Sequence, residues 1–279
     1  MIRNVSITVL VDDTPGDPGL LTEHGLSLWI EGDNSRLLFD TGQSDALLRN
    51  ARTLGIDLSK ADAIVISHGH YDHTGGLAAV MGLNSSAPVY CHENATVPRY
   101  SFRDDGQTHE IGMPHYCTEV LVGSRRMRPV DRPLEIAPGL HLTGPIPRIT
   151  AFEDTGGKFF LDPKARRPDP IQDDHSLWIE TGRGIVLVCG CCHSGIVNTL
   201  RYIEALRPGV SIRAIIGGFH LLNADNDRLS DTLKALAPLS LEKIVPCHCT
   251  GGAAIRAMSE SLGESVDIVK TGTITALLP

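Results

Sequence analysis

The segment 67–76 constrains the fold of this chain more than any other part of the sequence. It reads Ser-His-Gly-His-Tyr-Asp-His-Thr-Gly-Gly and follows the apolar run 63–66, which is typical of a buried strand. Three imidazoles and one carboxylate within six residues supply nitrogen and oxygen donors that suit Zn²⁺, Fe or Mn²⁺. A turn after a strand can direct two of these side chains to one side and two to another, which fits two neighbouring ions better than one or a solvated loop. The first two are His68 and His70, and the second two are Asp72 and His73.

Apolar runs of strand length recur along the whole chain, with helix signals between them. The strand runs are rich in Val and Ile and bounded by Gly, Asp or Asn. Strands are predicted at 5–11, 26–30, 36–39, 63–66, 88–90, 176–180, 184–189, 212–216 and 243–246. Helices are predicted at 44–54, 75–81, 196–206, 225–236 and 253–262. Alternation of strands and helices in both halves indicates sheets that are covered by helices.

Two long segments, 97–133 and 149–174, break this alternation. The first contains many Arg residues with several Gly and Pro, and the second contains several Lys and Arg residues. Long irregular segments inside a compact domain often form lids or binding loops. Solvated surface is the alternative interpretation, because charged loops are common on any protein.

Composition limits the partners and the compartment. The 33 acidic residues outnumber the 25 basic ones, and the net charge of −8 argues against a surface that binds duplex nucleic acid. No apolar run reaches the roughly 18 residues that cross a bilayer, and the first residues do not resemble a secretory signal. The odd number of cysteines, seven, argues against a fully paired disulfide scaffold. We therefore expect a cytoplasmic protein without a membrane span.

Five of the seven cysteines fall into two tight groups at the ends of predicted strands. Cysteines in such places can simply fill buried strand ends as small apolar residues. Each group also contains a histidine, however, which favours a role at a metal site. The groups are Cys189, Cys191, Cys192 and His193, and Cys247, His248 and Cys249.

The pattern His-x-His-x-Asp-His after a buried strand resembles the signature of the metallo-β-lactamase-fold hydrolase superfamily. We call the segment 67–76 the metal loop. The segment 37–42, Leu-Leu-Phe-Asp-Thr-Gly, resembles the first motif of that superfamily, in which Asp40 would orient the metal loop. Within the superfamily, the sequence looks like the branch of dihydropterin ribofuranosyl-aminobenzene phosphate synthases. The segments that carry this likeness are 23–27, 39–42, 67–77, 190–196, 217–221 and 247–251.

The resemblance implies one domain over residues 1–279 with the α/β fold of the superfamily. That fold is a four-layer αββα sandwich, helix–sheet–sheet–helix, built from two similar halves. We expect the segments of about 97–133 and 149–174 to be loop insertions. The metals are expected at the edge of the sandwich, where loops from both halves meet.

Carried over residue by residue, the superfamily pattern assigns two ligands of each ion to the metal loop. His68 and His70 would bind the first ion, and Asp72 and His73 would bind the second. The cofactors implied are two divalent metal ions. We expect zinc, with iron or manganese as alternatives.

The later ligands depart from the usual pattern. Cys191 stands after a predicted strand where the superfamily usually has a bridging Asp, so its thiolate or a water would link the ions; packing or support of a ligand is the alternative role. A thiolate would favour Zn²⁺ or Fe over Mg²⁺. His193 is the candidate for the missing ligand of the first ion, with a helix-start role as the alternative. His248 matches the last histidine motif and would complete the second site.

The expected chemistry is that of a dinuclear metal-dependent hydrolase or phosphate-ester-processing enzyme acting on a small anionic molecule. Metal ions lower the pKa of bound water to about 7, and Asp72 could orient this nucleophile or carry its proton. His220 and His24 could bind substrate, as donors to a developing oxyanion or a phosphate; His220 could also ligate metal, and His24 could be an exposed loop residue. The branch implies a pterin or ribosyl phosphate precursor and a possible synthase reaction. A di-iron redox or oxygen-handling protein and a metal-dependent sensor without catalysis are the alternatives.

Overall fold

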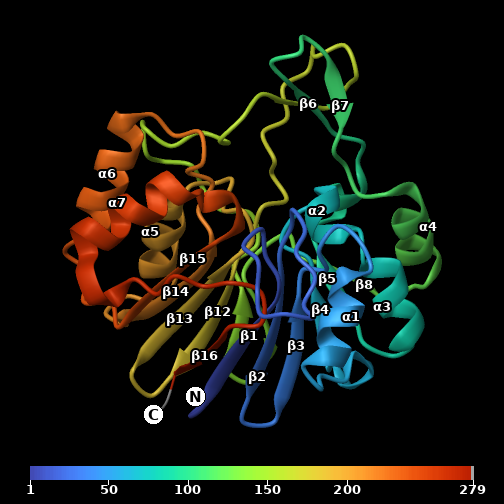
Figure 1. Cartoon of the computed structure of the whole chain (residues 1–279), viewed down its shortest axis with the longest axis horizontal. Helices are drawn as coiled ribbons and strands as arrows, with labels where there is room; N and C mark the ends of the chain where they lie inside the picture. Colours follow the sequence, from blue (N-terminus) through green and yellow to red (C-terminus); the bar gives the residue numbers. More distant parts are fainter. Residues whose placement is uncertain (278–279) are drawn as a thin grey trace.

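Two β-sheets face each other at the centre of the molecule, and helices cover the outer face of each (Figure 1). The computed structural model describes residues 1–277. The seven-stranded sheet has the order β16 (Ile274–Leu277), β1 (Val5–Val11), β2 (Ser27–Gly32), β3 (Ser35–Phe39), β4 (Ala63–Val65), β5 (Val89–Cys91) and β8 (Met127–Pro129). The six-stranded sheet has the order β15 (Lys243–Cys247), β14 (Ile212–Gly218), β13 (Gly184–Cys189), β12 (Leu177–Thr181), β10 (Leu140–Leu142) and β9 (Leu134–Ala137).

The helices divide between the two outer faces, and this completes the four-layer αββα sandwich that the sequence predicts. Those of the first half are α1 (Ala46–Thr53), α2 (Tyr71–Thr74), α3 (Leu77–Leu83) and α4 (His115–Gly123). Those of the second half are α5 (Ile196–Leu206), α6 (Asn226–Leu236) and α7 (Gly252–Leu262). Short 3-10 turns occur at Leu58–Lys60, Glu93–Thr96, His248–Thr250 and Gly263–Ser265.

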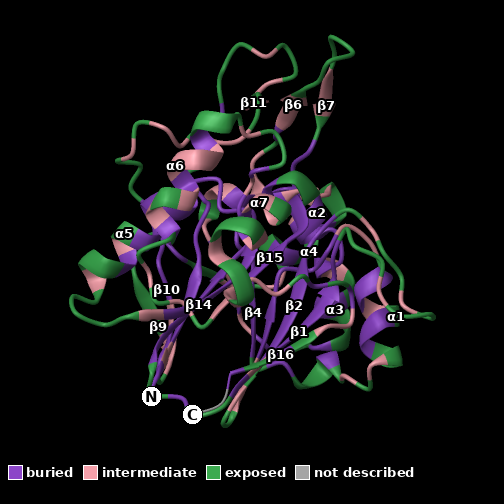
Figure 2. Ribbon diagram, turned by 60° about the vertical axis from the view of Figure 1, so that its left-hand side comes forward, coloured by how far each residue is buried: buried purple, intermediate pink, exposed green. Residues whose placement is uncertain are grey.

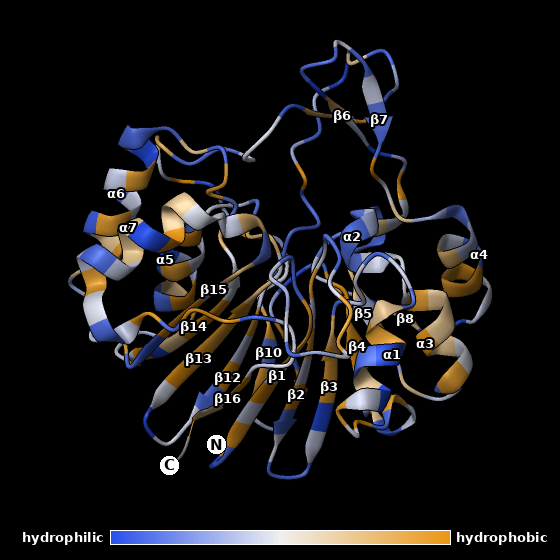
Figure 3. Cartoon of the chain, in the orientation of Figure 1, coloured by the Kyte–Doolittle hydropathy of each residue, from blue (hydrophilic) through white to orange (hydrophobic). Residues whose placement is uncertain are grey.

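Three apolar clusters hold these layers together. One lies between the sheets and joins residues such as Phe39 and Val186. The second packs the first sheet against α1, α3 and α4, and the third packs the other sheet against α5, α6 and α7. All six residues of β13 are buried, as a strand covered on both faces requires. Burying one Val, Leu or Ile side chain contributes roughly 1.5–3 kcal/mol, so these clusters are the main source of stability. Figure 3 shows the apolar residues concentrated in the sheets and inner helix faces.

The predicted strands and helices are confirmed, with ends that differ by a few residues. The sequence patterns missed several short elements, among them α4 and β8 inside the segment 97–133. β8 has three residues and pairs with β5, so it belongs to the main sheet although its own sequence shows no strand periodicity. β16 pairs with β1 near the N-terminus, a contact across nearly the whole chain that local patterns cannot show.

A small third sheet stands over one edge of the sandwich. It consists of β11 (Phe159–Phe160), β6 (Tyr100–Phe102) and β7 (Thr108–Glu110), and we call it the arch. Its strands come from the two segments that were predicted to be irregular. The arch is the most exposed part of the fold in Figure 2, whereas the strands beneath it are buried. No helix among residues 1–277 has the length and apolar character needed to cross a membrane.

Parallel pairing brings strand ends from both halves to the edge beneath the arch. β3, β4 and β5 run parallel in one sheet, and β13, β14 and β15 run parallel in the other. Loops that follow the carboxyl ends of parallel strands therefore meet there, which is the usual place for a ligand in such sheets.

Candidate metal centre

The metal loop begins where β4 ends, and its glycines let it pack tightly. A Cβ on Gly69 would lie 2.1 Å from the Ala95 carbonyl oxygen, and one on Gly75 would lie 2.0 Å from the carbonyl oxygen of Gln43. Only glycine fits such close approaches between backbones. The loop is thereby wedged between the segment after β3 and the segment after β5, with its imidazoles facing inward.

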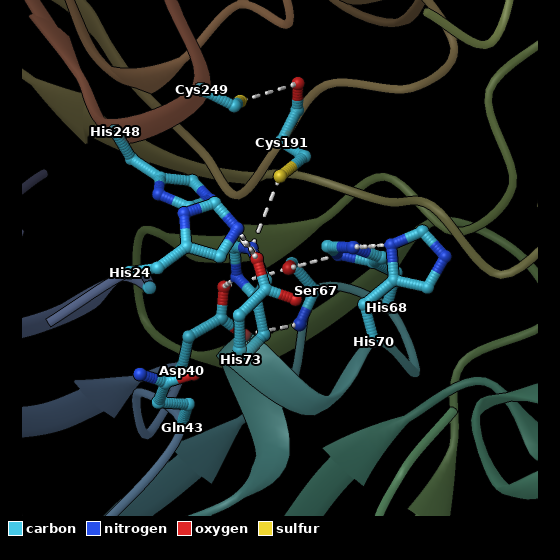
Figure 4. Close-up of polar contacts among 12 residues, drawn as sticks. His24, Asp40, Gln43, Ser67, His68, His70, His73, Cys191, His248 and Cys249 are labelled. Atoms are coloured by element: carbon cyan, nitrogen blue, oxygen red, sulfur yellow. Dashed lines mark hydrogen bonds and ion pairs between the residues drawn. The ribbon is translucent and has the colours of Figure 1, made fainter. Parts of the chain in front are cut away.

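Three histidines from the two halves meet at the first group of donor atoms, which we call the first donor set: His68, His70 and His193. His68 Nε2 lies 2.9 Å from His70 Nδ1, and His193 Nε2 lies 3.2 Å from the same atom. All three side chains are buried. The structure thus brings together the residues that were predicted to bind the first ion. Figure 4 shows His68 and His70 side by side on the metal loop.

Hydrogen bonds at the other ring nitrogens determine which atoms of this set carry lone pairs. Ser67 Oγ donates to Asp40 Oδ2 at 2.7 Å, so it can only accept from His68 Nδ1, which lies 2.9 Å away. His193 Nδ1 donates to the Thr155 carbonyl oxygen at 2.8 Å. The Nε2 atoms of both histidines are therefore unprotonated and both point at His70 Nδ1.

The second donor set consists of Asp72, His73 and His248, also from both halves. Asp72 Oδ2 lies 3.2 Å from His248 Nε2 and 3.6 Å from His73 Nε2. His73 Nδ1 donates to Asp40 Oδ2 at 2.7 Å, which leaves its Nε2 as an acceptor. The predicted ligands of the second ion are thus also brought together.

Cys191 lies between the two donor sets. Its Sγ is 3.1 Å from His73 Nε2, and it falls within 4.8 Å of donor atoms both in the second set and in a group with His193 and His220. Burial, with Cys249 and Asp72 nearby, raises the pKa of Cys191 well above the ordinary thiol value. As a thiol it donates to His73, and its Sγ lies near the second set and near His193 of the first; bridging by its thiolate stays a prediction.

Asp40 is the common support of both sets. It is fully buried just after β3, and its Oδ1 accepts from the Ser67 backbone N–H at 2.7 Å while Oδ2 accepts from Ser67 Oγ and His73 Nδ1. Through Ser67 it fixes His68, and directly it fixes His73. This is the orienting role that the sequence predicts for Asp40.

A carboxylate near the N-terminus holds the outer side of the second set. Asp13 accepts from His248 Nδ1 at 2.5 Å and from His24 Nδ1 at 2.8 Å, and His24 Nε2 lies 3.4 Å from Asp72 Oδ2. Although burial opposes its charge, these hydrogen bonds keep the pKa of Asp13 well below its ordinary value. The His24 side chain is 50% exposed, so it connects the buried Asp72 carboxylate with the cavity above it.

His220 follows β14 and lies beside the first donor set. Its backbone has a φ of +47°, and its ring centroid is 4.3 Å from that of His193. Its Nδ1 is buried and has no hydrogen-bond partner among residues 1–277. A Cβ on Gly156 would lie 1.8 Å from His220 Cδ2, so the glycine leaves the room that this ring occupies.

Burial keeps the imidazole lone pairs of the first donor set available at neutral pH, whereas His248 in the second set is held as a cation. Burial lowers the pKa of each histidine in the first donor set well below the ordinary value. Burial opposes the charge of Asp72, yet the neighbouring imidazoles, His73 first, hold its pKa well below that of a free carboxyl. Burial also opposes the cation of His248, but Cys249 and two carboxylates raise its pKa well above the ordinary value. The electrostatic surroundings of His248 Nε2 and Asp72 Oδ2 therefore stabilise a positive charge between these two atoms.

These observations fit divalent metal ions. Even with a proton on His70 Nδ1, only one of the two Nε2 lone pairs that face it could be satisfied by a hydrogen bond. A cation at this point would satisfy all three nitrogens, and one in the second set would satisfy a carboxylate and two imidazoles. Nitrogen, oxygen and sulfur donors in this combination are typical of Zn²⁺, with iron as an alternative.

A cavity of about 1240 Å³ opens between the donor atoms and the arch. His24, Asp72, Cys191, His220 and His248 reach its floor. The lining also includes three cationic side chains, Arg103, Lys158 and Arg228, and four aromatic ones, Tyr71, Phe102, Phe152 and Phe159. Five further acidic side chains also line it, which are Asp104, Asp105, Asp154, Asp225 and Asp227. The site is therefore open to a small molecule and can offer it both charge and flat apolar surface.

The sequence did not settle the role of several supporting residues. Asp173 and Asp174 could by sequence either support the site or be solvated acids before a strand; both are buried, and Asp173 accepts from Gly69 N–H and Asp174 from Ser194 N–H, each at 2.7 Å. Asp13 was not predicted. An acid next to an apolar strand end is the only feature that could have marked these positions.

The comparisons with known proteins agree with this geometry. Residues 22–248 match the family model described as the metallo-beta-lactamase superfamily. The chain is 31% identical over 294 aligned residues to the 7,8-dihydropterin-6-methyl-4-(beta-D-ribofuranosyl)-aminobenzene-5'-phosphate synthase of Methanocaldococcus jannaschii, and the alignment covers 98% of this chain and 97% of that protein. The likeness to this branch that the sequence motifs indicate is thus confirmed.

Solved structures show the same architecture. The structure of Tm1679, described as a metal-dependent hydrolase of the beta-lactamase superfamily, superposes with a TM-score of 0.82 at 32% identity and covers 99% of this chain and 100% of its own. The zinc-bound PqqB of Methylobacterium extorquens superposes with a TM-score of 0.60 at 12% identity over 97% of this chain and 99% of its own, which shows the fold alone.

Proposed function

This chain belongs to the metallo-beta-lactamase superfamily, and from that premise we propose that it is a dinuclear metal-dependent hydrolase or phosphate-ester-processing enzyme acting on a small anionic substrate. The observation that carries the proposal is the convergence of two buried donor sets beneath one open cavity. Divalent ions in these sets would supply a nucleophile derived from water at neutral pH and would polarise the oxygen atom under attack. We propose zinc, because thiol and imidazole donors together favour it.

The residues around the second donor set form a path for a proton. Asp72 is held as a carboxylate and faces the cavity, so its Oδ2 can accept a proton from the attacking water. His24 Nε2 lies 3.4 Å from the same oxygen, and its half-exposed ring can pass the proton to solvent or to a leaving group. Asp13 holds the His24 ring in the orientation that this step requires.

The other side of the site is suited to binding the substrate. His220 borders the first donor set and would donate a hydrogen bond to an oxyanion or a phosphoryl oxygen. Arg103 and Lys158 descend from the arch into the cavity lining and would bind an anionic group. Phe159 contacts His70 and His193 with ring centroids 5.3 Å apart, so the arch places an aromatic surface directly over the metals.

These features support a phosphorylated substrate that carries a flat ring. The relative from M. jannaschii is named for a product with a dihydropterin, an aminobenzene and a 5'-phosphate. A cavity of about 1240 Å³ whose walls carry aromatic side chains together with Arg103 and Lys158 is large enough for part of such a molecule. We extend the proposal to a synthase-type reaction on a compound of this class. We also place the protein in the cytoplasm, because all seven cysteines are described and are free thiols.

Metal analysis joined to an activity assay tests the proposal. Protein purified without added metal is expected to contain up to two zinc ions per chain and to hydrolyse a generic phosphodiester. His68→Ala and Asp72→Asn should each abolish this activity, whereas His115→Ala should not, because that histidine is exposed on α4. Activity that survives both changes would refute the dinuclear mechanism. Iron in place of zinc, with redox activity and no esterase activity, would favour the di-iron alternative.

A further inference from the structure

Residues 149–157, which we call the strap, run from the second sheet toward the arch and pass beside the metal centre. Their sequence reads as part of an irregular insertion, but the structure fastens them to α5. The backbone N–H groups of Ile149 and Thr150 both donate to Asn198 Oδ1 at 2.9 Å. Ordering an irregular segment costs conformational entropy, and these hydrogen bonds offset that cost and hold the strap in one position.

Glu153 makes further hydrogen bonds between the strap and the start of α5. Its carboxylate accepts from the backbone N–H groups of Val197 and Asn198, each at 2.8 Å, and from Thr150 Oγ1 at 3.0 Å. α5 begins after Gly195, which offers no capping side chain, and a Cβ there would lie 2.3 Å from Glu153 Cδ. Glu153 therefore caps α5 from outside the helix, as an anion at a positive helix end.

The strap delivers two backbone groups to the metal centre just beyond Glu153. The Thr155 carbonyl accepts from His193 Nδ1 at 2.8 Å and thereby leaves Nε2 unprotonated toward the first donor set. Gly156 lies against the ring of His220. One short segment thus touches His193 of the first donor set and the neighbouring His220.

A second fastening holds the strap to α6. Asp154 forms an ion pair with Arg228, whose side chain is only 8% exposed. Arg228 Nε is buried and has no hydrogen-bond partner among residues 1–277. Asp154 itself is 75% exposed, and its carboxylate also accepts from the Gly156 backbone N–H at 2.7 Å, so the pair with Arg228 is its contact outside the strap and holds the strap to α6.

We propose that Glu153 is a positioning residue for the metal centre. By fastening the strap to α5, it fixes the Thr155 carbonyl, and this carbonyl in turn fixes the tautomer and the orientation of the His193 ring. The Asp154–Arg228 pair is the second fastening in the same role. The inference rests on the proposed function in one respect, namely that His193 binds metal.

The test measures metal affinity and the protonation state of His193 separately. Zinc titration against a competing chelator should show that Glu153→Ala weakens one of two binding events about 10-fold, the usual effect of removing a support from a ligand. In metal-free protein labelled with ¹⁵N at histidine, the His193 Nδ1–H signal, assigned with His193→Gln, should be lost in this variant. Glu153→Gln keeps an acceptor oxygen and should restore part of both.

Asp57→Ala is the matched control. Asp57 also caps a short helical turn through a backbone N–H, that of Ser59, but it lies in the first half of the chain and touches no part of the strap. It should reduce stability without changing zinc affinity. If Glu153→Ala does not fold, Asp154→Asn replaces it, and a smaller loss of affinity in the same direction is expected because that residue is exposed.

The outcomes separate the two proposals. Wild-type protein that binds no metal would refute the proposed function, whereas the His193 signal would still report on the strap. Wild-type affinity and an unchanged His193 tautomer in Glu153→Ala, or in Asp154→Asn if the former does not fold, would overturn the role of the strap alone. An equal loss of zinc affinity in Asp57→Ala would also overturn it, because the effect would then follow stability.

Discussion

Replacing Asp40 by asparagine would alter the hydrogen-bond chemistry beneath the metal loop while keeping its shape. Asp40 accepts three hydrogen bonds of 2.7 Å, from Ser67 N–H, Ser67 Oγ and His73 Nδ1. Its φ of +58° lies in the left-handed region, which asparagine tolerates better than most residues. The substitution should therefore preserve the backbone and act on the hydrogen bonds alone.

The consequence follows from counting donors and acceptors. The amide oxygen of the substituted side chain can still accept from Ser67 N–H, but its NH₂ group would face the Nδ1–H of His73. To avoid two opposed donors, His73 must move its proton to Nε2, which turns the metal-facing atom from an acceptor into a donor. Losing a hydrogen bond to a charged group costs about 1.5–3 kcal/mol of unfolding free energy. Affinity for the second ion should fall by about 10–100-fold.

Two assays on Asp40→Asn check this reasoning. Urea unfolding of the metal-free protein measures the free energy, and zinc titration with a competing chelator measures the affinity. Asp62→Asn is the control, because Asp62 accepts from the Arg36 backbone N–H at 2.7 Å at an exposed position and should change neither quantity appreciably. Wild-type zinc affinity in Asp40→Asn, with unfolding free energy within about 0.5 kcal/mol of wild type, would refute the supporting role assigned to Asp40.

Three further predictions follow from the same geometry. Gly156→Ala should displace His220, because the new Cβ would overlap its ring, and a large loss of kcat with modest loss of stability is expected; unchanged kcat would contradict this contact. Burial lowers the pKa of each histidine in the first donor set below its unfolded value of about 6.5. The free energy of unfolding should therefore be at its full value above pH 6.5. It should fall below that pH, by up to about 1.4 kcal/mol per histidine and pH unit, because the unfolded chain binds protons that the folded chain does not. Urea unfolding of metal-free protein at pH 7.5, 6.5 and 5.5 measures the slope, and a flat profile would argue against neutral histidines. Cys191→Ser should remove the sulfur-to-metal charge-transfer absorption of the cobalt-substituted protein, and an identical spectrum would place the thiol outside the coordination shell.

The sequence predicted the strands, the helices and the metal loop because these show in local patterns, whereas the four-layer arrangement was implied by the resemblance to the superfamily. Strand runs such as Gly184–Cys189 are continuous and apolar since both of their faces are covered, and this shows in any short window. The metal loop concentrates its donors within a few residues. The strands that were missed, such as β8, have two to four residues each and depend on a neighbour for their pairing.

The supporting residues of the site could not be predicted in the same way, because their partners are distant in sequence. Asp13 binds His248 across 235 positions, and Asp173 reaches Gly69 across 104. A single acidic residue after a strand carries no mark that distinguishes a buried acceptor from a solvated one. Glu153 is a further case, since its role depends on a helix that begins more than forty residues later.

The central claim is that two donor sets, each built from both halves of the chain, hold two ions side by side. An anomalous difference map at the zinc edge, from crystals of protein loaded with zinc, tests it most directly. The account predicts two peaks, one among His68, His70 and His193 and the other among Asp72, His73 and His248, with Cys191 between them. A single peak, or peaks bound by other side chains, would contradict it.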